Sequence, residues 1–238
     1  LVEIENPSSA FNKYLRPSLL PNLLKNIKEN LRWFKDIRVF ELGRVFKRVD
    51  FGKYELPVLE KTMLSGLLAI KDGGDEGFFV LKGIIEALFE RLGIGDIQYL
   101  GLRHDSANIK QTSLLEQGKG WIDGKLLWHP GKSAEIKIKK ESIGFLGEVN
   151  SEIEEDLGIQ EQVFAFDLDF EKLLKFISDT KEYKPLPSYP ASFRDLAVLV
   201  PQGTKVAMVQ ETIQTVGGKL IAALDLFDIY QGKGIGKE

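Results

Sequence analysis

Three prolines close together, Pro185, Pro187 and Pro190, strongly constrain how this chain of 238 residues can fold. Proline lacks a backbone N–H and its ring fixes φ, so neither a helix nor a central strand can run through this segment. The residues around it are mostly polar, as in a connection between domains. The sequence therefore predicts a first domain over residues 1–180, a linker over 181–192 and a second region over 193–238.

The first part alternates helical and strand patterns. Apolar residues recur three and four positions apart from Leu19 to Phe34, which predicts an amphipathic helix over residues 18–35. Clusters of β-branched and aromatic residues predict strands over 37–46, 62–70, 134–140, 142–149 and 162–169. Further helices are predicted over 78–92, ending at Gly93, over 151–158, with Ser151 as N-cap and Gly158 as stop, and over 170–177. Hairpin strands together with long helices predict an α+β fold, in which helices cover an antiparallel sheet.

The second region is short. A strand is predicted over 195–200, a helix over 205–216 and a strand over 220–230. Three elements in about 50 residues bury little surface for an independent fold. Because the chain also begins at Leu1 instead of Met, we expect it to be a piece of a longer chain that includes only part of this second domain.

Composition excludes several classes of protein. The chain contains no cysteine, so disulfides, thiolate metal sites and cysteine nucleophiles are excluded. No apolar run approaches the ~20 residues that cross a bilayer, and residues 1–5 have neither the basic region nor the apolar core of a signal peptide. We expect a cytoplasmic protein that has no membrane partner.

Charge is distributed unevenly along the chain. Residues 6–53 contain eleven Lys or Arg and four Asp or Glu, whereas residues 141–182 contain three and twelve. This asymmetry fits a basic face toward RNA or an acidic partner. It fits equally two solvated faces of one domain, which is the interpretation we favour.

Histidines and glycines offer little chemistry. His104 and His129 have no His or Cys at metal-ligand spacing, so a zinc site is not expected. His104 could pair with Asp105 as a base and its orienting group, although adjacent side chains usually point apart. We expect His129 to shape a turn before a strand. Gly232, Gly234 and Gly236 open no helix and favour a hairpin turn over a phosphate-binding loop.

Two carboxylate clusters and one arginine could serve a function. Asp167 and Asp169 are two apart and should share one strand face, where they could bind a cation or act as acid and base. We favour an exposed strand face for them, and a solvated helix face for residues 154–156. Arg194, next to Phe193 and Asp195, suits RNA contact or an ion pair that pins the linker, and we favour the ion pair.

Several segments resemble, in order and spacing, the C-terminal half of bacterial-type phenylalanyl-tRNA synthetase β subunits. They are Asn6–Pro7, Leu15–Pro21, Asn30, Phe40–Phe46, Lys82–Leu88, His129–Ala134, Ile143–Val149, Tyr189–Pro190, Phe193–Ala197 and Leu226–Tyr230. One departure is Val149–Asn150, where the family often has His-Pro. The resemblance implies a class II aminoacyl-tRNA synthetase-like domain that has lost its active site, followed by a truncated ferredoxin-like anticodon-binding domain.

The resemblance also implies a non-catalytic role. Class II enzymes stabilise adenylation with an arginine on a strand and a second arginine in a GxGxxxR helix start. The chain has no GxGxxxR, although Lys47 and Arg48 follow the predicted strand. We therefore expect no cofactor here, while the whole heterotetrameric ligase would use ATP and magnesium. The alternative is an active class II-like ATP-dependent ligase or nucleotide-binding enzyme.

The implied partners are the catalytic α subunit and tRNA(Phe). Class II domains pair through a long helix and its adjoining strand, so the resemblance implies that the helix over 18–35, with Leu23 and Ile27, and the strand over 37–46 lie at or near the subunit contact. Phe193 and Arg194 are the candidate RNA contacts. Residues 187–238 contain five Lys or Arg and five Asp or Glu, so we expect the chain alone to bind the anticodon stem-loop weakly or not at all.

Overall fold

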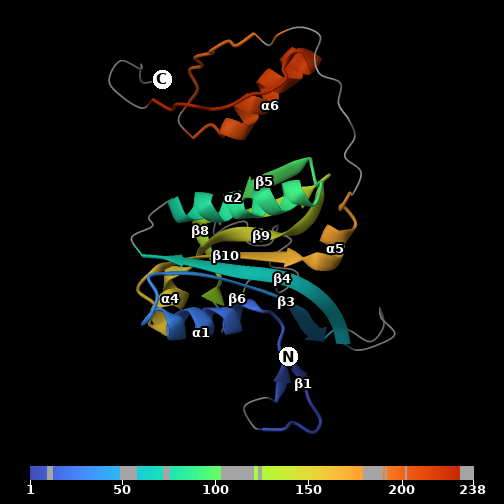
Figure 1. The fold of residues 1–238 in the computed structure, drawn as a ribbon, viewed down its shortest axis with the longest axis vertical. Helices are drawn as coiled ribbons and strands as arrows, with labels where there is room; N and C mark the ends of the chain where they lie inside the picture. The colour runs from blue at the N-terminus through green and yellow to red at the C-terminus, as the bar shows by residue number, and fades with distance from the viewer. Residues whose placement is uncertain are drawn as a thin grey trace. The chain divides into compact units, whose positions relative to one another are not determined.

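The computed structural model describes residues 1–9, 13–48, 58–71, 76–102, 121–122, 125–178, 190, 192–201 and 203–230. Contacts along the chain divide it into two compact units, Leu1–Tyr183 and Lys184–Glu238. The helices and strands of both units are labelled in Figure 1.

The first unit is built on a six-stranded sheet in which every neighbouring pair is antiparallel. From edge to edge its strands are β3 (Asp36–Arg48), β4 (Val58–Ile70), β10 (Gln162–Asp169), β9 (Glu141–Val149), β8 (Trp128–Ile138) and β5 (Ile97–Gly101). Two short ladders are separate from it: β1 (Val2–Glu3) pairs with β2 (Tyr14–Leu15), and β6 (Trp121–Ile122) with β7 (Lys125–Leu126). The antiparallel α+β architecture predicted from the sequence is confirmed.

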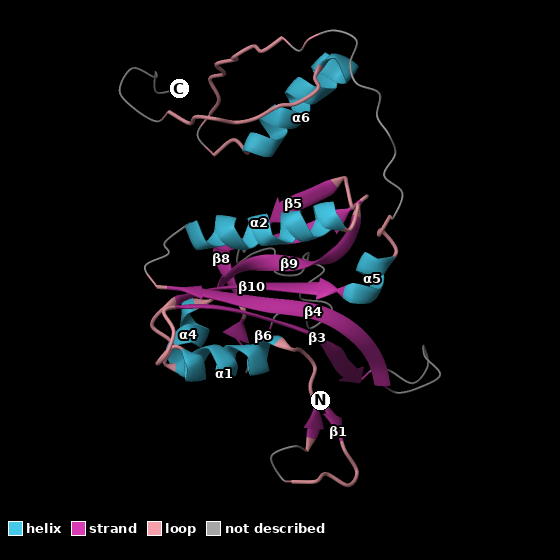
Figure 2. Cartoon of the chain, in the orientation of Figure 1, coloured by secondary structure: helices cyan, strands magenta, loops and turns pink. Residues whose placement is uncertain are grey.

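Helices cover both faces of this sheet, as Figure 2 shows. Helix α2 (Glu76–Arg91) lies on one face, and α1 (Leu20–Asn30) and α4 (Ser151–Leu157) lie on the other. Each face therefore has its own apolar core. The core on the α1 side includes Leu24, Ile27, Leu67, Trp128 and Val163. The core on the α2 side includes Ile85, Phe89, Leu146, Phe164 and Leu168.

Helix α1 is shorter than its apolar pattern predicts. It buries Leu20, Leu23, Leu24 and Ile27, and Pro21 lies in its first turn, where a missing N–H costs little. The chain leaves the helix at Asn30 instead of Lys35. The predicted stripe continued to Phe34, but the Phe34 side chain is 58% exposed, so nothing in the core extends the helix that far.

Helix α2 ends as predicted. Gly93 has φ +68°, and the N–H of Ile94 donates to the Phe89 carbonyl across this left-handed turn. Near its start, Gly77 lies so close to Phe164 that a Cβ there would come within 2.1 Å of the ring. This close approach lets α2 pack directly on β10. The helix begins at Glu76, two residues before the predicted Phe78.

The hairpin and the short helices largely follow the sequence. β8 and β9 are joined by Lys139 and Lys140, both with positive φ, as in a type I′ turn. The N-cap of α4 is Asn150 and not Ser151, because the Asn150 side chain accepts the N–H of Glu152. Gly158 ends α4 as predicted, with φ +68°. Helix α5 (Phe170–Leu174) stops three residues before the predicted Ile177.

The second unit contains helix α6 (Val206–Gly217), which confirms the predicted helix, and a 3-10 turn η3 (Gly218–Leu220). The strands predicted over 195–200 and 220–230 are wrong as strands, because neither segment forms a ladder in the described residues. A strand needs a hydrogen-bonded neighbour, and apolar composition alone does not supply one. None of this unit's described side chains is buried. In the described part of the whole chain, no helix is long and apolar enough to cross a membrane.

Candidate functional site

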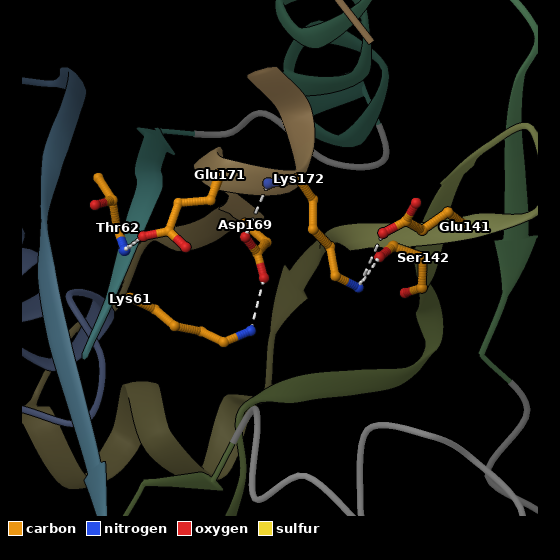
Figure 3. A network of polar contacts seen from close by, with 7 residues as sticks. All are labelled: Lys61, Thr62, Glu141, Ser142, Asp169, Glu171 and Lys172. Atoms are coloured by element: carbon orange, nitrogen blue, oxygen red, sulfur yellow. Dashed lines mark hydrogen bonds and ion pairs between the residues drawn. The ribbon is translucent and has the colours of Figure 1, made fainter. Parts of the chain in front are cut away.

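The junction between β10 and α5 holds a connected polar network, drawn in Figure 3. Asp169 ends β10 and is only 2% exposed. Its Oδ1 accepts the N–H of Lys172 at 3.2 Å, which caps α5, and its Oδ2 lies 2.9 Å from Nζ of Lys61 on β4. One carboxylate thus caps a helix and neutralises a lysine of a neighbouring strand.

The next two residues tie α5 to the sheet. Oε1 of Glu171 accepts the N–H of Thr62 at 3.2 Å. The Lys172 side chain reaches the other way, where its Nζ donates to the Ser142 carbonyl at 2.7 Å and lies 3.8 Å from Oε1 of Glu141. Figure 3 shows these contacts spreading from the helix to both sides. The network therefore fixes the position of α5 against β4 and β9.

Asp167 is the second carboxylate of this strand. Its Oδ1 accepts from Oγ of Ser65 at 2.5 Å, and Ser65 is completely buried. The exposed strand face favoured from the sequence is wrong for Asp169, which is buried beside Lys61. Among the described residues, no group of three or more His, Cys, Asp and Glu is arranged to hold a metal ion.

The electrostatics of the junction disfavour an anion. A helix N-terminus binds phosphate when its free N–H groups and positive dipole end face the ligand. At α5 the carboxylate of Asp169 already accepts one of these N–H groups and places a negative charge there. The residues at this junction therefore do not fit a nucleotide phosphate.

The position of Glu154 also differs from the one predicted from the sequence. The sequence placed it on a solvated helix face, but its side chain turns inward, it is 9% exposed, and its Oε1 accepts the N–H of Val163 at 2.8 Å. Burial raises the pKa of Glu154 to about 7, nearby Glu148 adds to the rise, and the hydrogen bond from Val163 opposes it. The signal missed was the position of Glu154 between Ile153 and Leu157 on a very short helix.

The other expected residues have no arrangement for catalysis. His129 lies within β8 and not in a turn before a strand: its Nδ1 accepts the N–H of Gly131 at 3.1 Å and its carbonyl accepts from Oγ of Ser133, where the ladder to β9 is interrupted between Trp128 and Ser133. His104 and Asp105 lie outside the described residues. The same holds for Gly232, Gly234 and Gly236.

Phe193 and Arg194 lie in the second unit and are both exposed, Phe193 by 88%. The guanidinium of Arg194 donates to the carbonyl of Phe193 at 2.7 Å. Within the described residues it forms no ion pair, so the pinning contact favoured from the sequence is not seen there.

Leu23 and Ile27 lie in the core of the first unit, with 3% and 0% of their surface exposed. Their side chains pack under the sheet of their own chain and offer no surface to a partner. The adjoining strand, which the resemblance also places at or near the contact, does carry exposed apolar side chains: Phe40 is 74% and Leu42 51% exposed, and neither was singled out from the sequence. The alternation of β3, with buried Ile37 and Val45 at odd positions, was the signal for them.

Comparisons with known proteins confirm the resemblance. A family model described as the phenylalanyl tRNA synthetase beta chain CLM domain matches residues 1–170, and one described as a ferredoxin-fold anticodon binding domain matches residues 187–238. Phenylalanine–tRNA ligase beta subunits of Fusobacterium nucleatum and Moorella thermoacetica are 33% and 32% identical over 100% and 97% of the chain. That of Clostridium acetobutylicum is 29% identical over 99%. The chain spans only 26% to 28% of the length of these relatives.

One solved structure also shares the fold. PylSc, a pyrrolysyl tRNA synthetase of Desulfitobacterium hafniense, superposes with a TM-score of 0.51 and 19% sequence identity. The match covers 73% of this chain and 50% of that one. At this identity the likeness shows a common fold and nothing more.

Proposed function

Because the chain belongs to the phenylalanyl-tRNA synthetase β chain family, we propose that it is a non-catalytic part of the β subunit of a phenylalanine–tRNA ligase. In this role it supports assembly with the catalytic α subunit and binding of tRNA(Phe). The observation that carries the proposal is the ordered match of both family models along the chain. The location that goes with this role is the cytoplasm, where translation takes place.

The first unit is proposed to be a class II-like domain without an active site. Its six-stranded antiparallel sheet shares the fold of a tRNA synthetase. The β10–α5 junction reads Phe-Asp-Leu-Asp-Phe-Glu-Lys from Phe166 to Lys172, and the carboxylates of Asp167 and Asp169 bond to Ser65 and Lys61. ATP and magnesium would then be held elsewhere in the whole ligase.

The domain division is part of the proposal. We assign residues 1–180 to the inactive class II-like domain, 181–192 to a linker and 193–238 to a ferredoxin-like anticodon-binding domain. The exposed Phe193 could stack on an unpaired base while Arg194 neutralises a phosphate. The division of the chain between Tyr183 and Lys184 supports this arrangement.

We place the α-subunit contact at or near α1 and β3. The buried side chains of Leu23 and Ile27 would hold α1 against the sheet and so support the contact indirectly. Exposed side chains such as Phe40 would touch the α subunit. Aromatic residues of this kind are enriched at protein interfaces.

Assembly with the α subunit tests the proposal. The chain and the α subunit of the same ligase, purified separately and mixed, should co-elute from a sizing column as a complex. Phe40→Ala should weaken this complex, whereas Phe79→Ala, an equally exposed phenylalanine on α2, serves as the matched control. Separate elution at concentrations of about 50 µM would contradict the proposed assembly role.

A further inference from the structure

Helix α2 presents an apolar line on the side that faces away from the sheet. Val80 is 36% and Ile84 41% exposed, and Gly83 and Ala87 are exposed as well. Positions three and four apart share one side of a helix, so Val80, Gly83 and Ala87 form a single outer line. This line lies opposite Ile85, which is completely buried in the core between α2 and the sheet. The packing of α2 on its own sheet therefore leaves the outer line without a partner.

Gly83 is the least expected member of this line. Glycine in the interior of a helix is less favourable than alanine, because it loses more backbone freedom on folding. A Cβ built on Gly83 would meet no atom within 4 Å, whereas one built on Gly77 of the same helix would strike the ring of Phe164. The fold of the chain thus explains the glycine at position 77 and not the one at 83. The bare backbone of Gly83 leaves a gap on the outer line that lets a second helix come close.

Two charges mark the ends of the outer line. Glu76 is the first residue of α2 and Arg91 is the last, and both are exposed. Neither forms an ion pair within the described residues. The rise of about 1.5 Å per residue places them roughly 22 Å apart, too far for them to pair with each other. The midpoint between them falls between Gly83 and Ile84.

From these observations we propose that α2 pairs antiparallel with α2 of a second copy of the chain, about a two-fold axis that passes between Gly83 and Ile84. Each Glu76 then lies beside Arg91 of the second copy, whereas a parallel pair would bring like charges together. Helix α2 and helix α1 cover opposite faces of the sheet (Figure 2), so this pairing leaves α1 and β3 free for another partner. The proposal goes beyond the proposed function and does not depend on it.

The apolar residues of the line fit the same axis. Val80 and Ala87 are equally distant from it, so each Val80 packs against the small Ala87 of the second copy. At the centre the two copies of Gly83 meet, which lets the helix axes approach to about 8 Å, and the two copies of Ile84 contact each other beside them. A contact along one helix of 16 residues buries on the order of 800 Å² in total, so the dimer is weak.

Gly83→Leu separates pairing from folding. Leucine is a better helix former than glycine and has open space within its own chain, so the melting temperature should stay the same or rise. The new side chain keeps two helices apart, so the dimer should be at least tenfold weaker. Phe79→Ala is the control: Phe79 is 67% exposed, but it points about 100° away from Val80 around the helix, so this variant should dimerise like the parent chain.

Sedimentation of the three chains between about 10 and 200 µM measures this difference. The parent chain should show dimer that grows with concentration. A parent chain that stays monomeric throughout this range, or a Gly83→Leu variant that dimerises as strongly as the parent, would overturn the proposal and leave the outer line of α2 to a different partner.

Charge reversal tests the antiparallel arrangement. Glu76→Arg and Arg91→Glu should each weaken the dimer at least fivefold in low salt, and the double variant should regain it, because opposite charges again lie side by side. Within one chain both native charges favour the helix dipole, so a role in the helix alone predicts that the double variant is the worst of the three. A double variant that dimerises no better than either single variant would overturn the proposed pairing.

Discussion

At the scale of single residues, Glu154 links burial to a measurable pH dependence. Its folded-state pKa is raised to about 7 from a usual value of 4.5, so the folded chain binds this proton more tightly than the unfolded chain. The free energy of unfolding should therefore fall as pH rises from 4.5 to 7, and level off above 7.

The variant Glu154→Gln isolates this effect, because glutamine keeps an oxygen for the N–H of Val163 but has no charge. At pH 8 it should be more stable than the parent chain by about 2 kcal/mol, and at pH 4, below the usual pKa, nearly equal to it. Urea unfolding at both pH values measures the difference. Glu152→Gln, an exposed site on the same helix, controls for the loss of one charge, and an identical pH trend in both variants would refute the role given to Glu154.

Asp169 shows which residue contacts a sequence can and cannot reveal. Period-two spacing placed Asp167 and Asp169 on one face of β10, and this followed from the strand alone. Their partners Ser65 and Lys61 are 102 and 108 positions away, so only the pairing of β10 with β4 brings them close. Local patterns contain no information about such partners, and the burial of Asp169 was missed for that reason.

At the scale of elements, the start of α5 depends on the two bonds of Asp169. Asp169→Ala removes both the helix cap and the partner of Lys61, and should lower the free energy of unfolding by about 2 kcal/mol. Asp169→Asn keeps an oxygen that can cap the helix, so its free energy of unfolding should fall by less than half of the loss in Asp169→Ala. Chemical unfolding of the two variants compares them. Equal losses would mean that the cap contributes nothing to stability.

Helix α1 tests whether core and interface can be separated. Leu23→Ala and Ile27→Ala should each lower the free energy of unfolding by about 3 kcal/mol, because both side chains are buried. Phe40→Ala, at an exposed position of β3, should change the free energy of unfolding by less than about 0.5 kcal/mol. Thermal unfolding of the chain alone measures these differences. Unchanged stability in Leu23→Ala would show that this side chain contributes nothing to the core.

The elements also show where pattern reasoning succeeds. β10 begins and ends at the predicted residues, because its apolar run coincides with pairing to β4 along its whole length, while β9 pairs with its middle from Phe164 to Leu168. β3 and β8 begin or end beyond their apolar patterns, since ladder pairing includes polar residues such as Arg48 and Ser133 in the strands. Residues 195–200 have the composition of a strand but no neighbouring strand in the described part of the chain, so composition misled there.

At the scale of the whole molecule, the charge of the second region, residues 193–238, predicts weak binding of RNA. The second region has equal numbers of basic and acidic residues and therefore gains little from counterion release. The chain alone should bind the anticodon stem-loop of tRNA(Phe) with a dissociation constant weaker than about 100 µM in low salt. A fluorescence titration measures this. Tight binding that Arg194→Ala abolishes would show that the chain is sufficient for recognition.

Pyrophosphate exchange tests the central claim, that this chain supports a ligase without performing its chemistry. Given phenylalanine, ATP and labelled pyrophosphate, the chain alone should form no labelled ATP above background, because it has no GxGxxxR arginine and because Asp169 already neutralises the charge of Lys61. Lys61→Met is the control, since residual activity from a contaminating ligase would survive it. Exchange above background that is lost in Lys61→Met would contradict the account and identify an active site in this chain.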